Sequence, residues 1–353
     1  MSRRTMPPDP RKRMQMADLA RLAGVSASTV SRALAGSPLI SEDTRTRIQT
    51  LARQFNYTVN SVATDLRSGV KRTIAVVVPY EQATRQSFGD PFLHGMIGAL
   101  ADALTERGYE MLLSRLDADR LDGIATLVDG GRAAGVVLIG QWRRHELLNS
   151  LAEHGLPLVV WGARMSHQHY CTVGGDNVGG GKLVAEHLLA QGRRQMVFLG
   201  DAGLPEVAQR FRGFCTVLKE HGIELGPQQR ANVPFLAESG RRTMLELIQS
   251  QPELDAVFAS SDLLAMAAIR ALRESGLRVP DDVAVVGYDD VEMAGMFSPP
   301  LSTVRQPIQE GGAALVAHLL SQLAGEMPPR ATVLDTVLIE RGSSRVDMKE
   351  IAE

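Results

Sequence analysis

Apolar residues between positions 16 and 34 recur at helical spacing in two groups, with a polar break between the groups. Four of them occupy positions i, i+1, i+3 and i+4 and predict one face of a first helix: Leu19, Ala20, Leu22 and Ala23. Val30 and Leu34 lie four residues apart and predict the buried face of a second helix. Between the two groups, Gly24 can take the left-handed backbone that follows a helix end, and Ser26 is a favourable N-cap. The pattern predicts two short helices joined by a tight turn.

Burial of Val30 and Leu34 would turn the polar and small residues of the second helix outward: Ala27, Ser28, Ser31 and Arg32. A helix–turn–helix places the start of its second helix in the DNA major groove, where such side chains can meet base edges. An ordinary helical pair in a small bundle would show the same apolar spacing. The choice between them therefore depends on charge and context.

Two further helical segments follow. Residues 41–55 predict a third helix, with Ser41 as its N-cap and with Ile48 and Leu51 facing inward. Residues 60–69 have apolar positions on one helical face, but so short a helix is not stable alone in water. We expect this segment to fold only against a partner, either its twin in a dimer or DNA.

From Thr73 onward, apolar strands alternate with amphipathic helices, which is the pattern of a parallel α/β sheet. The predicted strands are residues 73–79, 111–116, 133–140, 157–162, 195–200, 255–261 and 283–290, and the clearest helices are 92–109, 206–222 and about 262–274. The series predicts two successive Rossmann-like halves. Ligands of such folds bind beyond the carboxyl ends of the strands. The polar residues at those ends are Asp90, Gln141, Ser261, Asp262, Asp289 and Asp290.

The charge of the chain is divided unevenly. Residues 1–72 carry 13 Lys and Arg against 5 Asp and Glu, whereas the remaining residues carry 25 against 35. A basic module attached to an acidic body is expected of a nucleic-acid binder with a separate regulatory domain. A solvated basic tail would not place arginines such as Arg32, Arg45 and Arg47 within well-patterned helices. The charge distribution therefore favours DNA binding, and a chain of 353 residues suits two or three domains.

Several other classes of protein lack the residues they need. No run of about 18 apolar residues could span a membrane, and no apolar segment follows the basic N-terminus as in a secretory signal. Cys171 and Cys215 are too few for a disulfide scaffold, so we expect a cytoplasmic protein. No glycine-rich dinucleotide motif follows the first strand. Residues 174–182, GGDNVGGGK, resemble a phosphate loop but lack two residues that it requires, and we interpret them as a flexible crossover between the halves. With no nucleophile–base pair or metal-ligand spacing, we expect a non-enzyme without cofactor or metal.

The assembled motifs resemble the LacI/GalR family of bacterial transcriptional repressors over residues 15 to about 344. They are LARLAGVSASTVSRAL, SPLIS, NSVATDLRSGVKRTIAVVVP, RFRGF, VFASSDLLAMAAIRAL, VPDDVAVVGYDD and PPLSTVRQP. The resemblance implies a three-helix head, a hinge helix, and a two-lobed core similar to periplasmic sugar-binding proteins. It also implies a homodimer, and since no leucine heptads follow Arg345 we expect no tetramerising tail.

The resemblance and the pattern together suggest domain boundaries. We expect a disordered basic arm (1–14), a helix–turn–helix domain (15–59), a hinge (60–71), a core (72–344) and a tail (345–353). Within the core, the N-subdomain is expected at about 72–174 and 307–333, and the C-subdomain at about 175–306 and 334–344.

The resemblance also implies which residues bind. The DNA-contacting set is Ala27, Ser28, Thr29, Ser31 and Arg32 in the head, with Asn60, Leu66 and Arg67 in the hinge. The effector-binding set is Asp90, Phe92, Gln141, Arg210, Phe235, Ser261 and Asp289. Ser261 stands where the family usually has Asn, which leaves the identity of the effector open.

The function implied is a DNA-binding transcriptional regulator, a repressor, whose affinity for a pseudo-palindromic double-stranded operator is controlled by a carbohydrate. A purine-type corepressor is an alternative, because Tyr80, Phe88, Phe92 and Phe235 would also suit a flat base. A sugar-binding protein without a DNA role is a further alternative. The basic helical head and the missing signal segment count against it.

Overall fold

The computed structural model describes residues 14–57, 71–81 and 88–345. The chain divides into two compact units, residues 1–71 and 72–353. We call them the head and the core. The predicted hinge helix, including Asn60, Leu66 and Arg67, lies outside the described residues.

The head is a three-helix unit made of α1 (Met16–Ala23), α2 (Ala27–Leu34) and α3 (Glu42–Gln54). Leu19, Val30 and Ile48, one from each helix, are fully buried against one another. Gly24 has φ 63°, as the tight turn requires, and the Ser26 side chain accepts a hydrogen bond from the Thr29 amide at 3.2 Å. The predicted helix–turn–helix is therefore confirmed.

Two apolar positions of the head depart from the prediction. Leu22 is 37% exposed, because the adjacent Leu19 and Ala23 already fill the contact with the other helices. Leu34 is half-buried, and Ala33 takes the fully buried place beside Val30.

Lobe 1 of the core is a parallel sheet with strand order β11-β5-β4-β3-β1-β2. Its strands are β1 (Thr73–Tyr80), β2 (Glu110–Asp117), β3 (Gly135–Ile139), β4 (Leu158–Trp161), β5 (Cys171–Gly175) and β11 (Ala331–Leu334). Helices α5 (Pro91–Glu106) and α13 (Ile308–Leu323) cover one face, and η1 (Ala118–Gly123), α6 (Ile124–Asp129) and α7 (His145–Glu153) cover the other. Along β1, Ile74 and Val76 pack under α5 while Ala75 and Val77 face the opposite layer. Burial on both faces explains why this strand is continuously apolar.

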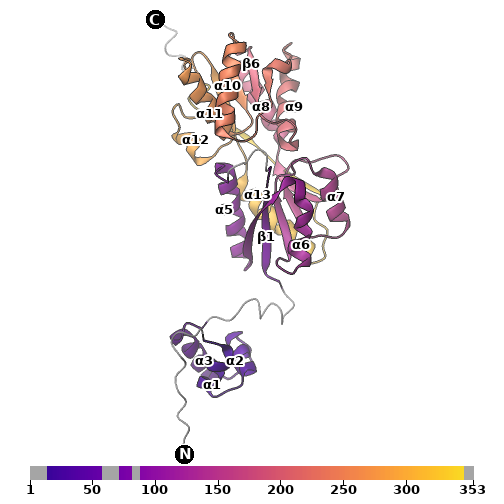
Figure 1. The fold of residues 1–353 in the computed structure, drawn as a ribbon, viewed down its shortest axis with the longest axis vertical. Coiled ribbons are helices and arrows are strands. Elements are labelled where there is room, and N and C mark those ends of the chain that lie inside the picture. The colour runs from indigo at the N-terminus through magenta and orange to yellow at the C-terminus, as the bar shows by residue number, and fades with distance from the viewer. Residues whose placement is uncertain (1–13, 58–70, 82–87, 346–353) are drawn as a thin grey trace, which may run out of the picture. The chain divides into compact units, whose positions relative to one another are not determined.

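Lobe 2 repeats the same architecture with strand order β12-β10-β9-β8-β6-β7. Its strands are β6 (Met196–Leu199), β7 (Arg230–Ala231), β8 (Ala256–Ala259), β9 (Ala284–Asp289), β10 (Ser302–Arg305) and β12 (Val337–Ile339), with β12 antiparallel to β10. On one face lie α10 (Ala237–Ser250), α11 (Asp262–Glu274) and α12 (Glu292–Met296), and on the other lie α8 (Asn177–Ala190) and α9 (Pro205–Glu220). A short 3-10 turn, η2 (Pro227–Gln229), precedes β7. Figure 1 shows the two lobes one above the other in the core. The predicted pair of Rossmann-like halves is confirmed.

The chain crosses between the lobes at three places, and all three involve strands that the sequence pattern did not predict. It passes from β5 of lobe 1 to α8 of lobe 2, from β10 back to α13, and from β11 to β12. The first crossing includes the segment 174–182. It does cross between the halves, but the interpretation as a flexible segment is wrong, because its residues form the end of β5 and the first turns of α8.

Gly181 of that segment and Gly213 of α9 allow the two helices to pack closely. A Cβ built on Gly181 of α8 would lie 2.0 Å from the Arg210 carbonyl oxygen of α9, and one on Gly213 would lie 2.0 Å from the Val178 carbonyl oxygen. Only glycine permits this approach of the two backbones. The crossing of α8 and α9 therefore fixes the position of Arg210.

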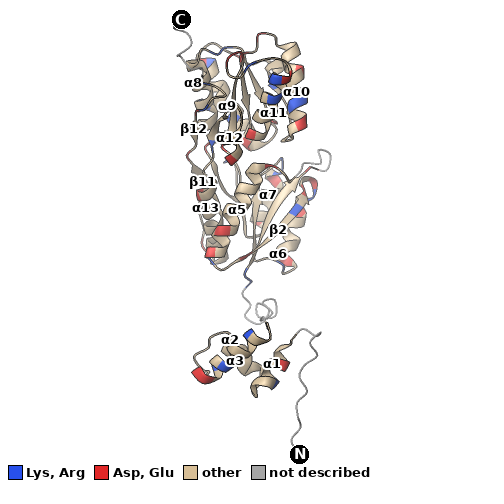
Figure 2. Cartoon of the chain, turned by 90° about the vertical axis from the view of Figure 1, so that its left-hand side faces the viewer, with Lys and Arg blue, Asp and Glu red and all other residues tan. Residues whose placement is uncertain are grey.

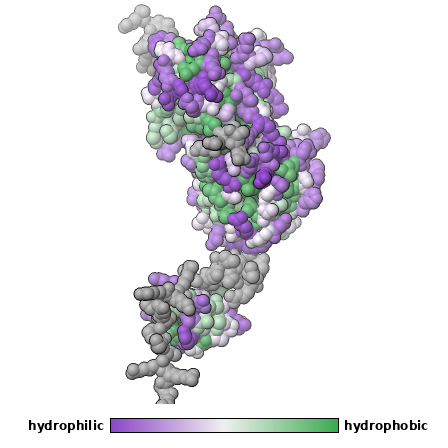
Figure 3. Space-filling view, in the orientation of Figure 1, coloured by the Kyte–Doolittle hydropathy of each residue, from purple (hydrophilic) through white to green (hydrophobic). Residues whose placement is uncertain are grey.

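Polar side chains lie on the outside of both lobes. Figure 2 shows the acidic and basic residues mainly on helices and loops, whereas most strand residues are uncharged. Hydrophobic residues on the face seen in Figure 3 are interspersed with hydrophilic ones. Among the helices that the structure describes, none combines the length and apolar character needed to cross a membrane.

Candidate functional site

In the head, the predicted base-contacting residues lie at the start of α2. Ala27, Ser28 and Arg32 are exposed, whereas Thr29 and Ser31 are partly buried. The Ser26 hydroxyl lies 2.8 Å from both the Ser28 and the Thr29 hydroxyls. These two side chains are therefore pre-positioned on the first turn of the helix, and Arg32 projects one turn further on.

One arginine of the head has a structural role instead. Arg45 donates from Nη2 to the backbone oxygens of Ser37 and Ile40, at 3.1 and 3.2 Å. It closes the loop between α2 and α3.

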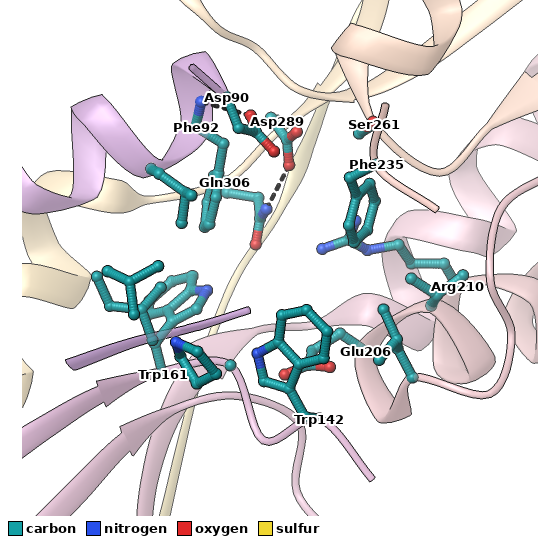
Figure 4. A pocket seen from close by; sticks show the side chains of 17 residues that line it. Asp90, Phe92, Trp142, Trp161, Glu206, Arg210, Phe235, Ser261, Asp289 and Gln306 are labelled. Atoms are coloured by element: carbon teal, nitrogen blue, oxygen red, sulfur yellow. Dashed lines mark hydrogen bonds between the residues drawn. The ribbon is translucent and has the colours of Figure 1, made fainter. Parts of the chain in front are cut away.

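The core contains a cavity of about 100 Å³ between the lobes, open to solvent at one side. Six of the seven predicted effector-binding residues line it (Figure 4): Asp90, Phe92, Arg210, Phe235, Ser261 and Asp289. They come from the carboxyl ends of strands and the amino ends of helices in both lobes. This is the position that the strand pattern predicted.

Gln141 does not line the cavity, contrary to the prediction. Its side chain is fully buried in lobe 1, where Nε2 donates to the Ala163 oxygen and the Tyr170 hydroxyl, and Oε1 accepts from the Ala163 amide, each at 2.8 Å. These bonds turn the amide inward and leave the next residue, Trp142, to face the cavity.

The prediction also missed four polar or aromatic residues of the lining: Trp142, Trp161, Glu206 and Gln306. Trp161 ends β4, and its ring lies 6.3 Å from that of Phe92. Glu206 lies in the first turn of α9, and Gln306 follows β10. The strand-end rule would have found Trp161 and Gln306 if it had been applied to apolar residues and to β10.

Arg210 is held firmly in lobe 2. Its Nε donates to Asn177 Oδ1 at 2.9 Å and its Nη1 to the Ser260 oxygen at 2.6 Å. The guanidinium also lies 3.8 Å above the centre of the Tyr288 ring. A cation fixed on three sides in this way can orient a ligand without rearranging.

Two carboxylates of the cavity, Asp90 and Asp289, are buried, and Glu206 is half-buried. Asp90 caps α5 and accepts a bond from the Phe92 amide at 3.0 Å, and Asp289 accepts one from Gln306 Nε2 at 2.7 Å. Burial raises the pKa of Asp90, of Asp289 and of Glu206, although the Coulomb attraction of Arg210 opposes each shift. Burial also raises the pKa of Asp262, which lies just outside the cavity, above its ordinary value.

Several hydrogen bonds and ion pairs join the two lobes beside the cavity. Arg143 of lobe 1 forms ion pairs with Glu81, at 2.7 Å, and with Asp201 of lobe 2. Glu206 accepts a bond from the Gln141 backbone amide at 3.3 Å, and Gln209 Nε2 donates to the Arg164 oxygen at 2.8 Å. The amino end of α9 and the loop before it therefore hold lobe 2 against lobe 1.

The fold and the site define a class of protein: a helix–turn–helix DNA-binding domain followed by a two-lobed core with a small-molecule cavity between its lobes. Residues 15–60 match the model of bacterial regulatory proteins of the lacI family, and residues 185–344 match the periplasmic binding protein-like domain. The chain is 34% identical over 341 residues to the HTH-type transcriptional regulator CelR of Thermobifida fusca, covering 94% of this chain and 99% of that protein. The chain belongs to the lacI family of bacterial regulatory proteins. It is a DNA-binding transcriptional regulator and not an enzyme.

Two solved structures are similar along nearly the whole chain. A transcriptional regulator CelR–cellobiose complex has 32% identity and a TM-score of 0.70, covering 94% of this chain and all of that one. The lac repressor dimer bound to operator and the anti-inducer ONPF has 24% identity and a TM-score of 0.83, covering 95% of this chain and all of that one. At 24% identity, the similarity to the lac repressor shows only that the two chains share a fold.

Proposed function

We propose that the chain is a repressor whose affinity for its operator is set by a carbohydrate bound between the lobes. The observation that carries the proposal is the composition of the cavity, which pairs aromatic faces with charged hydrogen-bonding groups. Phe92, Trp142 and Phe235 can stack on a sugar ring, while Asp289 and Arg210 can accept from and donate to its hydroxyls. The likeness to the CelR–cellobiose complex supports the same class of ligand.

On the DNA side, we propose that the exposed start of α2 enters the major groove, with Ala27, Ser28 and Arg32 at the base edges. A single short helix can contact only a few base pairs. We therefore propose a homodimer that binds a pseudo-palindromic operator.

Binding of ligand would be tested on the full-length protein by thermal shift and then by calorimetry, with cellobiose, glucose and hypoxanthine. Arg210→Ala should remove carbohydrate binding, because it deletes the fixed cation of the cavity. Arg212→Ala is the matched control, since Arg212 lies on the same helix but is exposed. Carbohydrate binding that survives Arg210→Ala unchanged, or that is lost equally in Arg212→Ala, would contradict this assignment.

A purine-type corepressor is the second candidate, because the flat faces of Phe92, Trp161 and Phe235 would also stack on a nucleobase. A thermal shift with hypoxanthine and none with either sugar would favour it. Operator binding measured with and without the active ligand then tells whether the ligand induces or represses.

A further inference from the structure

The cavity is lined by more acidic than basic groups. Of the described residues that line it, three are carboxylic acids, Asp90, Glu206 and Asp289, and one is basic, Arg210. The other lining residues are uncharged. A ligand that enters this cavity is therefore surrounded by more acidic than basic groups.

Most of the hydrogen-bonding capacity of Arg210, the basic residue of the lining, is used by other residues of the protein. Arg210 uses Nε and Nη1 for bonds to Asn177 and Ser260, and its charge is shared with the face of the Tyr288 ring. Nη2, which has no bond among the described residues, is left to meet a ligand. One N–H group of this kind suits a hydroxyl, whereas a phosphate or a sugar acid would also face three carboxylates.

Asp90 and Asp289, the two most buried acids of the cavity lining, face each other across the gap between the lobes (Figure 4). Asp90 of lobe 1 is 8% exposed and Asp289 of lobe 2 is 5% exposed. Each accepts one hydrogen bond at Oδ1, from the Phe92 amide and from Gln306, and within the described residues each Oδ2 has none. Two buried carboxylates with open oxygens disfavour each other's ionisation, and a cation between them would satisfy both.

Aromatic rings complete this environment. Phe92, Trp142, Trp161 and Phe235 line the same cavity, with faces that can contact the apolar side of a sugar ring. Aromatic faces also attract cations, and together with carboxylates they form the usual surroundings of a protein-bound ammonium group.

We propose that the effector is an amino sugar, whose protonated amine lies between Asp90 and Asp289 while its ring lies against the aromatic residues. The proposal rests on the carbohydrate-binding function proposed above and narrows it. It disfavours phosphorylated sugars and sugar acids, because the same carboxylates would repel them.

The test compares two disaccharides of the same shape, cellobiose and the β-1,4-linked disaccharide of glucosamine, which carries an amine in place of a hydroxyl on each ring. Calorimetry on the full-length protein should show the amino disaccharide binding at least about tenfold more tightly at low salt, with the difference shrinking as salt is added. Glucose 6-phosphate should bind more weakly than glucose. Equal or tighter binding of cellobiose would overturn the amine assignment and leave the carbohydrate function intact. If neither disaccharide nor any monosaccharide binds, the carbohydrate function itself fails.

Two variants locate the amine. Asp90→Asn and Asp289→Asn each keep a side-chain oxygen for the bond at Oδ1 but remove the charge. In each variant the ratio of the two affinities, amino disaccharide over cellobiose, should fall most of the way to one. Asp129→Asn, an exposed acid at the end of α6, is the control and should leave the preference unchanged. A preference that persists in both cavity variants would place the amine elsewhere and overturn the proposed contact.

A second measurement separates charge recognition from shape. The charged groups around the pair are Arg210, His94 and Asp262, with Asp262 raising and Arg210 lowering the pKa of Asp289. Binding of an ammonium group should therefore release protons from the carboxyl pair. Calorimetry at several pH values from about 4 upward, in buffers of different ionisation enthalpy, should detect this release for the amino disaccharide and not for cellobiose. The absence of any difference between the two ligands would contradict the contact.

Discussion

The close approach of α8 to α9 offers a sharp test of how the fold supports the site. Gly181→Ala would add a Cβ that lies 2.0 Å from the Arg210 carbonyl oxygen and 2.9 Å from the Phe214 amide nitrogen. Both neighbours are backbone atoms of a helix, so neither can rotate away. Relieving the contact requires the two helices to separate by about 1 Å, since an ordinary contact of this kind is near 3.2 Å.

The expected magnitude combines two opposing effects. Overpacking of a close-packed interior costs about 1–3 kcal/mol. Alanine in a helix is favoured over glycine by about 1 kcal/mol, which offsets part of that cost. Because the added Cβ would overlap a fixed backbone atom, we place the packing cost in the upper part of its range, about 2–3 kcal/mol. The net loss of unfolding free energy is then about 1–2 kcal/mol, or a fall of a few degrees in the melting temperature. Because Arg210 belongs to the displaced backbone, ligand affinity should fall as well.

Gly98→Ala is the matched control. Gly98 lies within α5, and a Cβ built there has no other atom within 4 Å. This variant should therefore keep or raise the melting temperature, with unchanged ligand affinity. Differential scanning calorimetry of the two variants beside the wild type measures the contrast. If Gly181→Ala melts at or above the wild type, the close packing inferred for α8 and α9 is wrong.

Four further predictions concern DNA binding and pH. In gel shifts on selected operators, a pseudo-palindrome should bind far more tightly than a single half-site, and equal affinities would contradict the dimer. Arg32→Ala should cost about 1–3 kcal/mol on the cognate operator and relax preference at one base pair, whereas Lys71→Ala should weaken all sequences alike and flatten the salt dependence. An equal loss of specificity in the Arg32→Ala and Lys71→Ala variants would contradict the assignment of Arg32 to base contact and Lys71 to phosphate contact. Leu66→Ala should weaken operator binding but leave the effector affinity of the DNA-free protein unchanged, which calorimetry with and without operator would measure. A large change in effector affinity in the absence of DNA would contradict this prediction. Burial raises the pKa of Asp289, so as pH rises from about 4 the unfolded state ionises first and stability is lost. The melting temperature of Asp289→Asn relative to wild type should therefore increase as the pH rises above about 4, and a constant difference would refute this linkage.

The long apolar strands and amphipathic helices were predictable because their burial pattern is regular. For example, α11 was expected at about 262–274 and is found at Asp262–Glu274. The missed strands are short and lack a regular local pattern. The strand β5 contains two glycines and β12 has only three residues, and the pairing of β5 with β11 joins residues about 160 positions apart in the chain.

The site was predictable to the level of the strand end but not to the direction of each side chain. Gln141 and Trp142 are adjacent at the end of β3, and a polar residue was the natural choice for a cavity. The backbone of Ala163, which no local pattern indicates, instead binds the Gln141 amide and turns it inward. Glu206 was missed because candidate site residues were sought only at strand ends, although the sequence predicted the start of its helix at residue 206.

The three crossings between the lobes have a consequence for how the protein is made. Neither sheet is complete until the last part of the chain has been added, because β11 finishes lobe 1 and β12 finishes lobe 2. During synthesis the head, whose three helices share their own hydrophobic core, can fold as soon as it leaves the ribosome, whereas both lobes must wait for residues beyond 330. A nascent or prematurely terminated chain would therefore present a folded DNA-binding head attached to a core in which β5 and β10 are exposed as sheet edges. Such a product could neither close around a ligand nor protect itself from aggregation.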